Sequence, residues 1–186
     1  MVKARLPVNL PLQGKRVRLD ALNEDDLPVL RSFFRDPAAL YYYVPSPVFP
    51  RTLAQLRKNM ADWHDNRQYF TFAIRAGEQL AGLLHLDSVD YTNGNAEIGI
   101  AITNTESRGQ GFASEAISLM LDYAFGELRL ERITARIIDG NEPSLKLFRG
   151  LGFTHEGRLR HFVRRGNSWH DMHVFSILSS EWAERK

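Results

Sequence analysis

A glycine-bearing loop between a strand-like run and a strongly periodic helix constrains this chain more than any other feature. The loop spans Arg108 to Ala113 and reads R-G-Q-G-F-A, and the apolar run before it covers 96–102. Apolar residues then recur at helical spacing over 113–124. Glycines permit a sharp turn and a close approach of the backbone, and the free N–H groups of a helix N-terminus attract anions. The sequence therefore predicts a strand, a pyrophosphate-binding loop and a helix in succession.

The amino-acid sequence of this loop distinguishes between the common phosphate-binding motifs. It holds no G-x-x-x-x-G-K-[ST] pattern, and it lacks the third glycine of a dinucleotide fingerprint. It does read R-x-x-G-x-A, with Arg108, Gly111 and Ala113 at the three fixed positions. This resembles the [QR]-x-x-G-x-[GA] acetyl-CoA loop of the GNAT N-acetyltransferase superfamily.

The resemblance extends over residues 95–178, where further motifs follow in the family's order. These are Glu97, N-E-P-S at 141–144, L-G-F at 151–153, E-G at 156–157 and a final strand at 169–178. Together they are similar to the RimJ/RimL-like branch, which acetylates N-terminal amines of ribosomal proteins and includes relatives that act on small amines. Residues 16–90 agree mainly in the order of their elements.

Hydrophobic periodicity and turn signals predict alternating strands and helices without a linker or repeat, which favours one domain over residues 1–186. The expected strands are 16–19, 69–75, 79–87, 96–102, 133–139 and a long hairpin that turns at 166–167; the expected helices are 23–36, 52–64, 113–124 and one that begins near Asn141. Strand, helix and strand from Glu97 to Asp139 form a β-α-β crossover. The fold class is thus mixed α+β, GNAT-like, with a mostly antiparallel sheet and flanking helices.

Acetyl-CoA is the acetyl donor that the resemblance implies, with CoA as product. In the family, the strand that carries Glu97 and the strand matching 133–139 diverge, and the pantetheine arm lies in that gap. The residues expected to contact the cofactor are Ile100, Ala101, Ile102, Arg108, Gly109, Gln110, Gly111, Phe112, Ala113, Ser114, Asn141, Ser144 and Phe148.

The reaction requires a proton acceptor, because an alkylammonium cannot attack a thioester until it loses a proton. Glu97 is the expected catalytic base, since it is the only acidic residue of its strand and some family members place a catalytic glutamate at the matching position. The alternative reading of Glu97 is a structural carboxylate that is paired or hydrogen-bonded. Glu24, Asp87 and Asp90 are the reserve candidates.

The CoA thiolate also needs a proton, and here the sequence departs from the family. Many relatives place a tyrosine at the position of Phe148, and phenylalanine cannot donate a proton. Ser144 is the expected catalytic alternative, because some relatives carry a serine there near the thiol. Asn141 and Ser144 could equally cap the helix that begins beside them.

Composition limits the remaining functions. The 24 basic and 22 acidic residues are too balanced to imply nucleic-acid binding, and no run approaches the length of a membrane span, so a cytoplasmic protein is expected. The absence of cysteine excludes a cysteine acyl-enzyme and favours direct transfer in a ternary complex. No metal is expected, because His170 and His173 would face opposite sides of a strand.

The acceptor is expected to be a primary amine, with a homodimer possible. Its contacts are expected from Tyr41, Tyr42, Tyr43, His64 and His85, since family substrates enter past the first helices and their loop. A protein or peptide N-terminus is the favoured acceptor, and a polyamine, aminoglycoside or other small amine is the alternative. A CoA-binding module without catalysis is a further alternative, suggested by Phe148.

Overall fold

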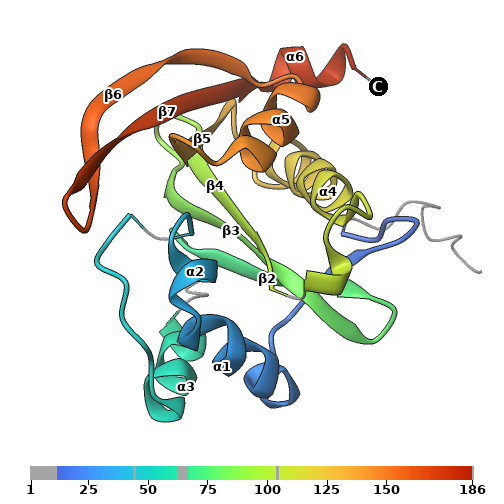
Figure 1. The fold of residues 1–186 in the computed structure, drawn as a ribbon. Helices are drawn as coiled ribbons and strands as arrows, with labels where there is room; N and C mark the ends of the chain where they lie inside the picture. Colours follow the sequence, from blue (N-terminus) through green and yellow to red (C-terminus); the bar gives the residue numbers. More distant parts are fainter. Residues whose placement is uncertain (1–11, 44, 63–66, 104, 186) are drawn as a thin grey trace, which may run out of the picture.

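A mixed seven-stranded sheet organises the part of the chain that the structure describes. The computed structural model describes residues 12–43, 45–62, 67–103 and 105–185. The strand order is β1-β2-β3-β4-β5-β7-β6 (Figure 1), and the strands are β1 (Arg18–Asp20), β2 (Phe70–Ala76), β3 (Gln79–Asp90), β4 (Asn95–Ile102), β5 (Arg132–Ile138), β6 (Thr154–Arg165) and β7 (Ser168–Leu178). The β4–β5 pair is parallel and the other five strand pairs are antiparallel.

Helices cover both faces of this sheet. They are η1 (Glu24–Asp26), α1 (Leu27–Arg35), α2 (Pro37–Leu40), α3 (Leu53–Asp62), η2 (Thr105–Ser107), α4 (Phe112–Gly126), α5 (Glu142–Gly150) and α6 (Ser179–Ala183). Figure 1 shows α4 and α5 on one side and α1, α2 and α3 on the other. Their buried apolar residues form two cores, one under α4 and α5 and one between α1, α3 and strands β2 and β3.

The α4 helix is held by its apolar stripe. Ala116, Ile117, Met120, Leu121 and Ala124 are each 0% exposed, so the periodicity seen in the sequence corresponds to the face that packs on the sheet. Fully burying one such large side chain contributes roughly 1.5–3 kcal/mol. This packing fixes where the helix begins relative to the end of β4.

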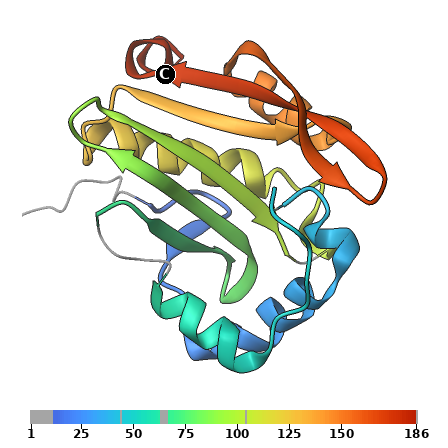
Figure 2. The same cartoon turned by 90° about the vertical axis from the view of Figure 1, so that its left-hand side faces the viewer.

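The parallel pair is short, and this shapes the site. β4 and β5 are paired only from Asn95↔Arg132 to Glu97↔Thr134, whereas β5 continues against β7 as far as Ile138↔Met172. Beyond Glu97 the two strands diverge (Figure 2), so the expected gap between them is confirmed. Residues 98–102 of β4 keep β3 as their partner on the other side.

The expected elements match the structure with small shifts at their ends. The largest change lies at 23–36, where a 3-10 turn precedes α1, and Asp36 begins a separate helix α2 by accepting a hydrogen bond from the Ala38 N–H. The expected end of the 52–64 helix lies partly outside the described residues. β3 runs to Asp90, three residues further than expected, because a register shift after Asp87 lets the strand continue to the turn at Asn93 and Gly94.

Candidate active site

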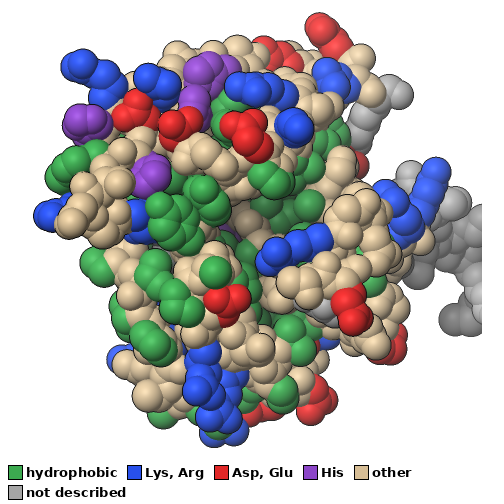
Figure 3. All heavy atoms as spheres, viewed as in Figure 1, with side chains coloured by type: hydrophobic (Ala, Val, Ile, Leu, Met, Phe, Trp, Pro, Cys, Tyr) green, Lys and Arg blue, Asp and Glu red, His purple; other side chains and the backbone are tan. Residues whose placement is uncertain are grey.

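A cavity of about 770 Å³, which we call the donor groove, runs between α2, the end of β4, the loop before α4 and the start of α5. Figure 3 shows a hollow near the centre of this face, bordered by hydrophobic side chains. The groove brings together eleven of the thirteen residues expected at the cofactor: Ile100, Ala101, Ile102, Arg108, Gly109, Gly111, Phe112, Ala113, Ser114, Asn141 and Ser144. Residues that are far apart in the sequence and were expected at one site therefore line one cavity.

The other two expected cofactor residues do not line this groove. Gln110 donates from its side-chain Nε2 to the Glu106 carbonyl at 2.7 Å. Phe148 is buried, lies edge-on against Phe153 at a ring-centroid distance of 4.9 Å, and borders a neighbouring cavity instead. Its hydrophobic environment explains why phenylalanine is accommodated there.

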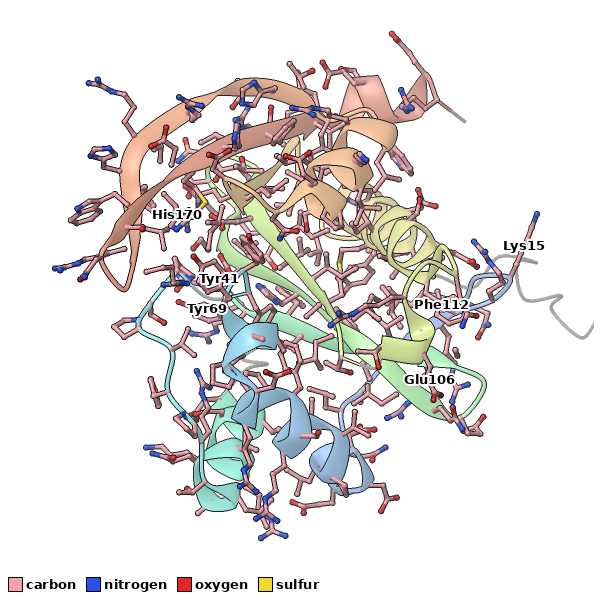
Figure 4. The ribbon with its side chains drawn as sticks, viewed as in Figure 1. Lys15, Tyr41, Tyr69, Glu106, Phe112 and His170 are labelled. Carbon is pink, nitrogen blue, oxygen red and sulfur yellow. The ribbon has the colours of Figure 1, made fainter. Side chains whose placement is uncertain are left out.

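The loop before α4 has the backbone geometry of an anion-binding cradle. Gly109 and Gly111 have φ angles of 73° and 77°, which favour glycine, and Gly111 is the N-cap residue without a capping side chain. Arg16 links the loop to α4, because its Nη1 donates to the Gln110 carbonyl at 2.7 Å and its Nε donates to the Glu115 carboxylate at 2.9 Å. Phe112 stands at the helix start in Figure 4. The N-terminus of a fifteen-residue helix thus faces the donor groove.

A middle cavity of about 170 Å³ adjoins the donor groove and shares Asn141 and Ser144 with it. The Asn141 side chain accepts a hydrogen bond from the Ser144 backbone N–H at 3.4 Å, so it caps α5, as the alternative reading proposed. Ser144 itself is half-buried and lines both cavities where they meet.

Glu97 lies in this middle cavity, where Arg136 of β5 contacts it. The Arg136 Nε and the Glu97 Oε2 are 2.6 Å apart, and the side chains are 38% and 24% exposed. Burial raises the pKa of Glu97, while the adjacent Arg136 guanidinium acts to lower it. Arg136 was not expected from the sequence, although its position two residues after Thr134, the parallel partner of Glu97, places both side chains on one sheet face.

His85 and Asp87 lie on the same sheet face as Glu97. The strand register pairs His85 with Gly99 and Asp87 with Glu97, and cross-strand partners share a face. The His85 Nε2 lies 3.6 Å from the Asp87 Oδ2. Burial lowers the pKa of His85, and Asp87 acts in the opposite direction. The middle cavity thus holds an imidazole, two carboxylates and a guanidinium.

An outer cavity of about 330 Å³ continues from the middle one beneath α1 and the loop after α2. Its walls include the aromatic rings of Phe34, Tyr43 and Tyr69, and its polar groups include Arg51 and Asp62. Burial raises the pKa of Tyr43 to about 12, so this phenol stays neutral. The Arg51 guanidinium lies 5.0 Å from the Phe34 ring centroid.

The expected acceptor residues divide between these cavities. Tyr42 borders the donor groove and the middle cavity, Tyr43 borders all three cavities, and His85 borders the middle and outer ones. His64 lies outside the described residues. Of the reserve carboxylates, Asp87 lines the site, whereas Glu24 pairs with Arg57 on the surface and Asp90 accepts hydrogen bonds within its own turn.

Tyr41 borders none of the three cavities; it joins the acceptor side to the β6–β7 hairpin. Its hydroxyl lies 3.0 Å from the His170 Nε2, and its carbonyl accepts a hydrogen bond from the Arg165 Nε at 3.0 Å. Figure 4 shows Tyr41 and His170 between α2 and the hairpin.

Within the described residues, no group of three or more His, Cys, Asp or Glu side chains could hold a metal ion. None of the helices in that part of the chain combines the length and apolar character that crossing a membrane requires.

Comparison with known proteins defines the family. Residues 16–154 match the model of the acetyltransferase (GNAT) domain. The N-acetyltransferase p20 of Bacillus licheniformis, itself uncharacterised, is 31% identical over 177 residues, which cover 92% of this chain and 98% of that protein. The spermidine N(1)-acetyltransferase of Escherichia coli K12 is 28% identical over 147 residues, covering 78% and 76%. YdaF of Bacillus subtilis, provisionally named a ribosomal N-acetyltransferase, is 35% identical over 130 residues, covering 67% and 69%.

The fold agrees with this assignment. A crystal structure of spermidine N-acetyltransferase from Vibrio cholerae, in complex with CoA and spermine, superposes with a TM-score of 0.82 at 24% identity, covering 90% of this chain and 98% of that one. The GNAT fold expected from the sequence is thereby confirmed. The chain belongs to the GNAT acetyltransferase family and is an acetyl-CoA-dependent N-acetyltransferase.

Proposed function

We propose that this enzyme transfers the acetyl group of acetyl-CoA to the primary amine of a small molecule, by direct transfer between two bound substrates. The observation that carries the proposal is a series of three neighbouring cavities, in which the middle one shares lining residues both with the donor groove and with an outer cavity of about 330 Å³. That volume falls at the lower end of the range for small-ligand pockets. A spermidine acetyltransferase among the relatives supports a small amine as acceptor.

The donor groove fits acetyl-CoA in two respects. The uncapped start of α4, with Gly109 and Gly111 in the left-handed region, offers backbone N–H groups to the pyrophosphate. The β4 backbone at residues 98–102, which β5 leaves open, offers hydrogen-bonding groups to the pantetheine arm. When bound, acetyl-CoA supplies the thioester carbonyl that the amine attacks.

Proton transfers belong to the middle cavity in this proposal. Glu97, expected as the base, shares its carboxylate with Arg136, so we propose that it acts as a negative charge that favours a proton nearby. Ser144, at the junction with the donor groove, is proposed to return a proton to the CoA thiolate. Asn141 is proposed to hold the start of α5 in place through its cap.

A peptide N-terminus is the second candidate acceptor. The 35% identity to YdaF and the motifs similar to the RimJ/RimL-like branch favour it. The outer cavity is lined by Arg51 together with the carboxylates of Asp62 and Asp87, so the charges of its walls do not by themselves exclude either kind of acceptor.

An acetyl-CoA consumption screen tests the proposal. The acceptors are small monoamines, polyamines, aminoglycosides, amino acids and N-terminal peptides, each with and without enzyme. We expect turnover with a small amine. Turnover with peptides alone would establish the second candidate, and CoA binding without consumption of acetyl-CoA would identify a silent CoA-binding module.

A further inference from the structure

His85 occupies the junction between the middle and outer cavities. Within the described part of the chain, four residues line both of these cavities: Tyr43, Pro45, His85 and Asp87. Proline carries no titratable group, and Tyr43 is neutral because burial raises its pKa to about 12. Among the described residues that line both cavities, His85 is therefore the one whose side chain ordinarily titrates nearest to neutral pH.

The His85 ring also reaches the strand that borders the donor groove. It lies across Gly99 of β4, where a Cβ atom would stand 2.2 Å from the His85 Nε2. Gly99 directly precedes Ile100, which lines the donor groove at the place where β5 has left β4. The absence of a side chain at position 99 thus lets one imidazole nitrogen approach the donor side while the ring borders the outer cavity.

The groups around His85 suit a neutral imidazole that gains a proton during the reaction. The Asp87 Oδ2 lies 3.6 Å from Nε2, too far for a good hydrogen bond but close enough to stabilise an imidazolium. The Tyr43 ring lies edge-on to the His85 ring, with 6.1 Å between the ring centroids. Glu97, which pairs with Arg136, is the cross-strand partner of Asp87. In the outer cavity, Arg51 and Asp62 provide one charge of each sign.

Glu97 is less suited to be the first proton acceptor. Its Oε2 is held by Arg136 at 2.6 Å, and it lines the middle cavity but not the outer one, from which we expect the acceptor to enter. Burial lowers the pKa of His85, so its ring is neutral and retains a lone pair at neutral pH. A histidine in that state is an effective general base.

We propose that His85 is the catalytic residue that takes the proton from the acceptor ammonium, with Asp87 stabilising the imidazolium that forms. This inference rests on the proposed function. One N–H bond of the ammonium breaks as the Nε2–H bond of His85 forms, and the freed nitrogen lone pair makes the new C–N bond while the C–S bond breaks. The Ser144 hydroxyl gives its proton to the departing thiolate and takes up the second proton that the nitrogen loses, and the imidazolium releases its proton to solvent.

The pH dependence of kcat/KM with a verified acceptor tests the proposal. Wild-type enzyme can use the ammonium form of the acceptor, so a plot of log kcat/KM against pH should be nearly flat between about pH 7 and 9. An enzyme without its base can use only the neutral amine, whose fraction rises tenfold per pH unit, so the plot should have a slope of about +1. His85→Gln should therefore lose about 100-fold at pH 7 and recover much of it at pH 9. His155→Gln, a change at a histidine on β6 outside all three cavities, is the matched control and should stay flat.

Glu97→Gln separates the two candidate bases. We expect it to lower kcat/KM while leaving the profile flat. If Glu97→Gln acquires the slope and His85→Gln does not, Glu97 is the base and the proposal is wrong. Wild-type enzyme that binds CoA but acetylates no amine would instead overturn the proposed function, and the role of His85 with it.

Two further measurements do not rely on replacing His85. NMR titration of the His85 imidazole should give a midpoint below the ordinary histidine value, and Asp87→Asn should lower it again, because the carboxylate stabilises the imidazolium. A midpoint at or above the ordinary value would contradict the proposal. Gly99→Ala should push the ring away and reproduce the pH slope with CoA affinity retained, whereas Gly126→Ala, at a position with no atom within 4 Å of the new Cβ, should not.

Discussion

Arg75 of β2 and Glu97 of β4 each belong to an arginine–carboxylate pair, and the two pairs are held very differently. Arg75 and Asp26 are 6% and 4% exposed, and two hydrogen bonds of 2.9 and 2.8 Å join them. Arg75 also donates to the Ala21 carbonyl and to Asp20. We call Asp20, Asp26 and Arg75 the anchor cluster.

The second group of charges is less completely paired. The Arg136 Nε and the Glu97 Oε2 are 2.6 Å apart, the side chains of Glu97 and Arg136 are 24% and 38% exposed, and the His85 Nε2 stands 3.6 Å from the Asp87 Oδ2. We call His85, Asp87, Glu97 and Arg136 the site cluster. The Arg75–Asp26 pair of the anchor cluster is buried, doubly hydrogen-bonded and ties η1 to the sheet, whereas the site cluster borders cavities. The more buried of the two arginine–carboxylate pairs thus lies away from the three cavities, and the more exposed one lines the candidate site.

Breaking the anchor cluster should have the largest effect on stability. Arg75→Met leaves the Asp26 carboxylate buried without its partner, which should cost about 3–5 kcal/mol in the free energy of unfolding. Urea titration measures this loss, and the folded fraction should keep its turnover per molecule. Asp87→Asn is the matched change in the site cluster and should leave stability nearly intact. Equal losses of stability in the two variants would erase the distinction.

The donor loop tests the site cluster from the other side, because the proposed role of that cluster requires acetyl-CoA to bind beside it. Gly111→Asp places a negative charge where we expect the pyrophosphate and demands a left-handed backbone from a non-glycine residue. CoA affinity should fall by at least about tenfold, which calorimetry measures. A folded Gly111→Asp variant that binds CoA as the wild type does would refute this placement of the cofactor.

Arg136 should set the protonation of Glu97 within the site cluster. The guanidinium acts to lower the pKa of that carboxyl, so Arg136→Met should raise it further, and Glu97 should become protonated at a higher pH than in the wild type. Activity should then fall about tenfold in the mildly acidic range and recover above neutral pH. A pH–rate profile checks this, with thermal melting as the control. An unchanged acid limb would mean that the charge of Glu97 does not contribute.

Arg51 should have the smallest effect, on the choice of acceptor. It lines the outer cavity without belonging to either cluster. Arg51→Glu removes a repulsive charge and adds an attractive one, so kcat/KM for a polyamine should rise about threefold or more relative to a monoamine. Salt should weaken the difference because the cavity is partly exposed. A preference that does not change would place the acceptor's charge away from Arg51.

Much of the donor side could be predicted because its signals are local. Glycines that require positive φ, a helix that begins directly after them and an apolar stripe on that helix lie within 109–124, and each follows from the chemistry of neighbouring residues. The reading of Asn141 as a cap was equally local, since the residue bonds the N–H three positions along. Short-range geometry of this kind depends little on the rest of the fold.

The acceptor side was predicted less completely because its contacts join distant parts of the chain. The aromatic triplet at 41–43 was expected to face the acceptor, but Tyr41 instead meets His170, 129 residues away, on the hairpin. Arg136 escaped notice because nothing near it in the sequence indicates that it will stand beside Glu97. Such pairs depend on strand order and register.

The sequence alone determined the family, the α+β class, the donor loop and Glu97 as the candidate carboxylate, because each follows from the type and spacing of residues that are close together in the sequence. The tertiary structure decided which of several carboxylates and histidines share a cavity. Register places His85 opposite Gly99 and Asp87 opposite Glu97, and the divergence of β5 from β4 after residue 97 opens the site beside them. Side chains far apart in sequence acquire common chemistry only when strand pairing sets them on one face, and that pairing depends on the packing of the whole sheet.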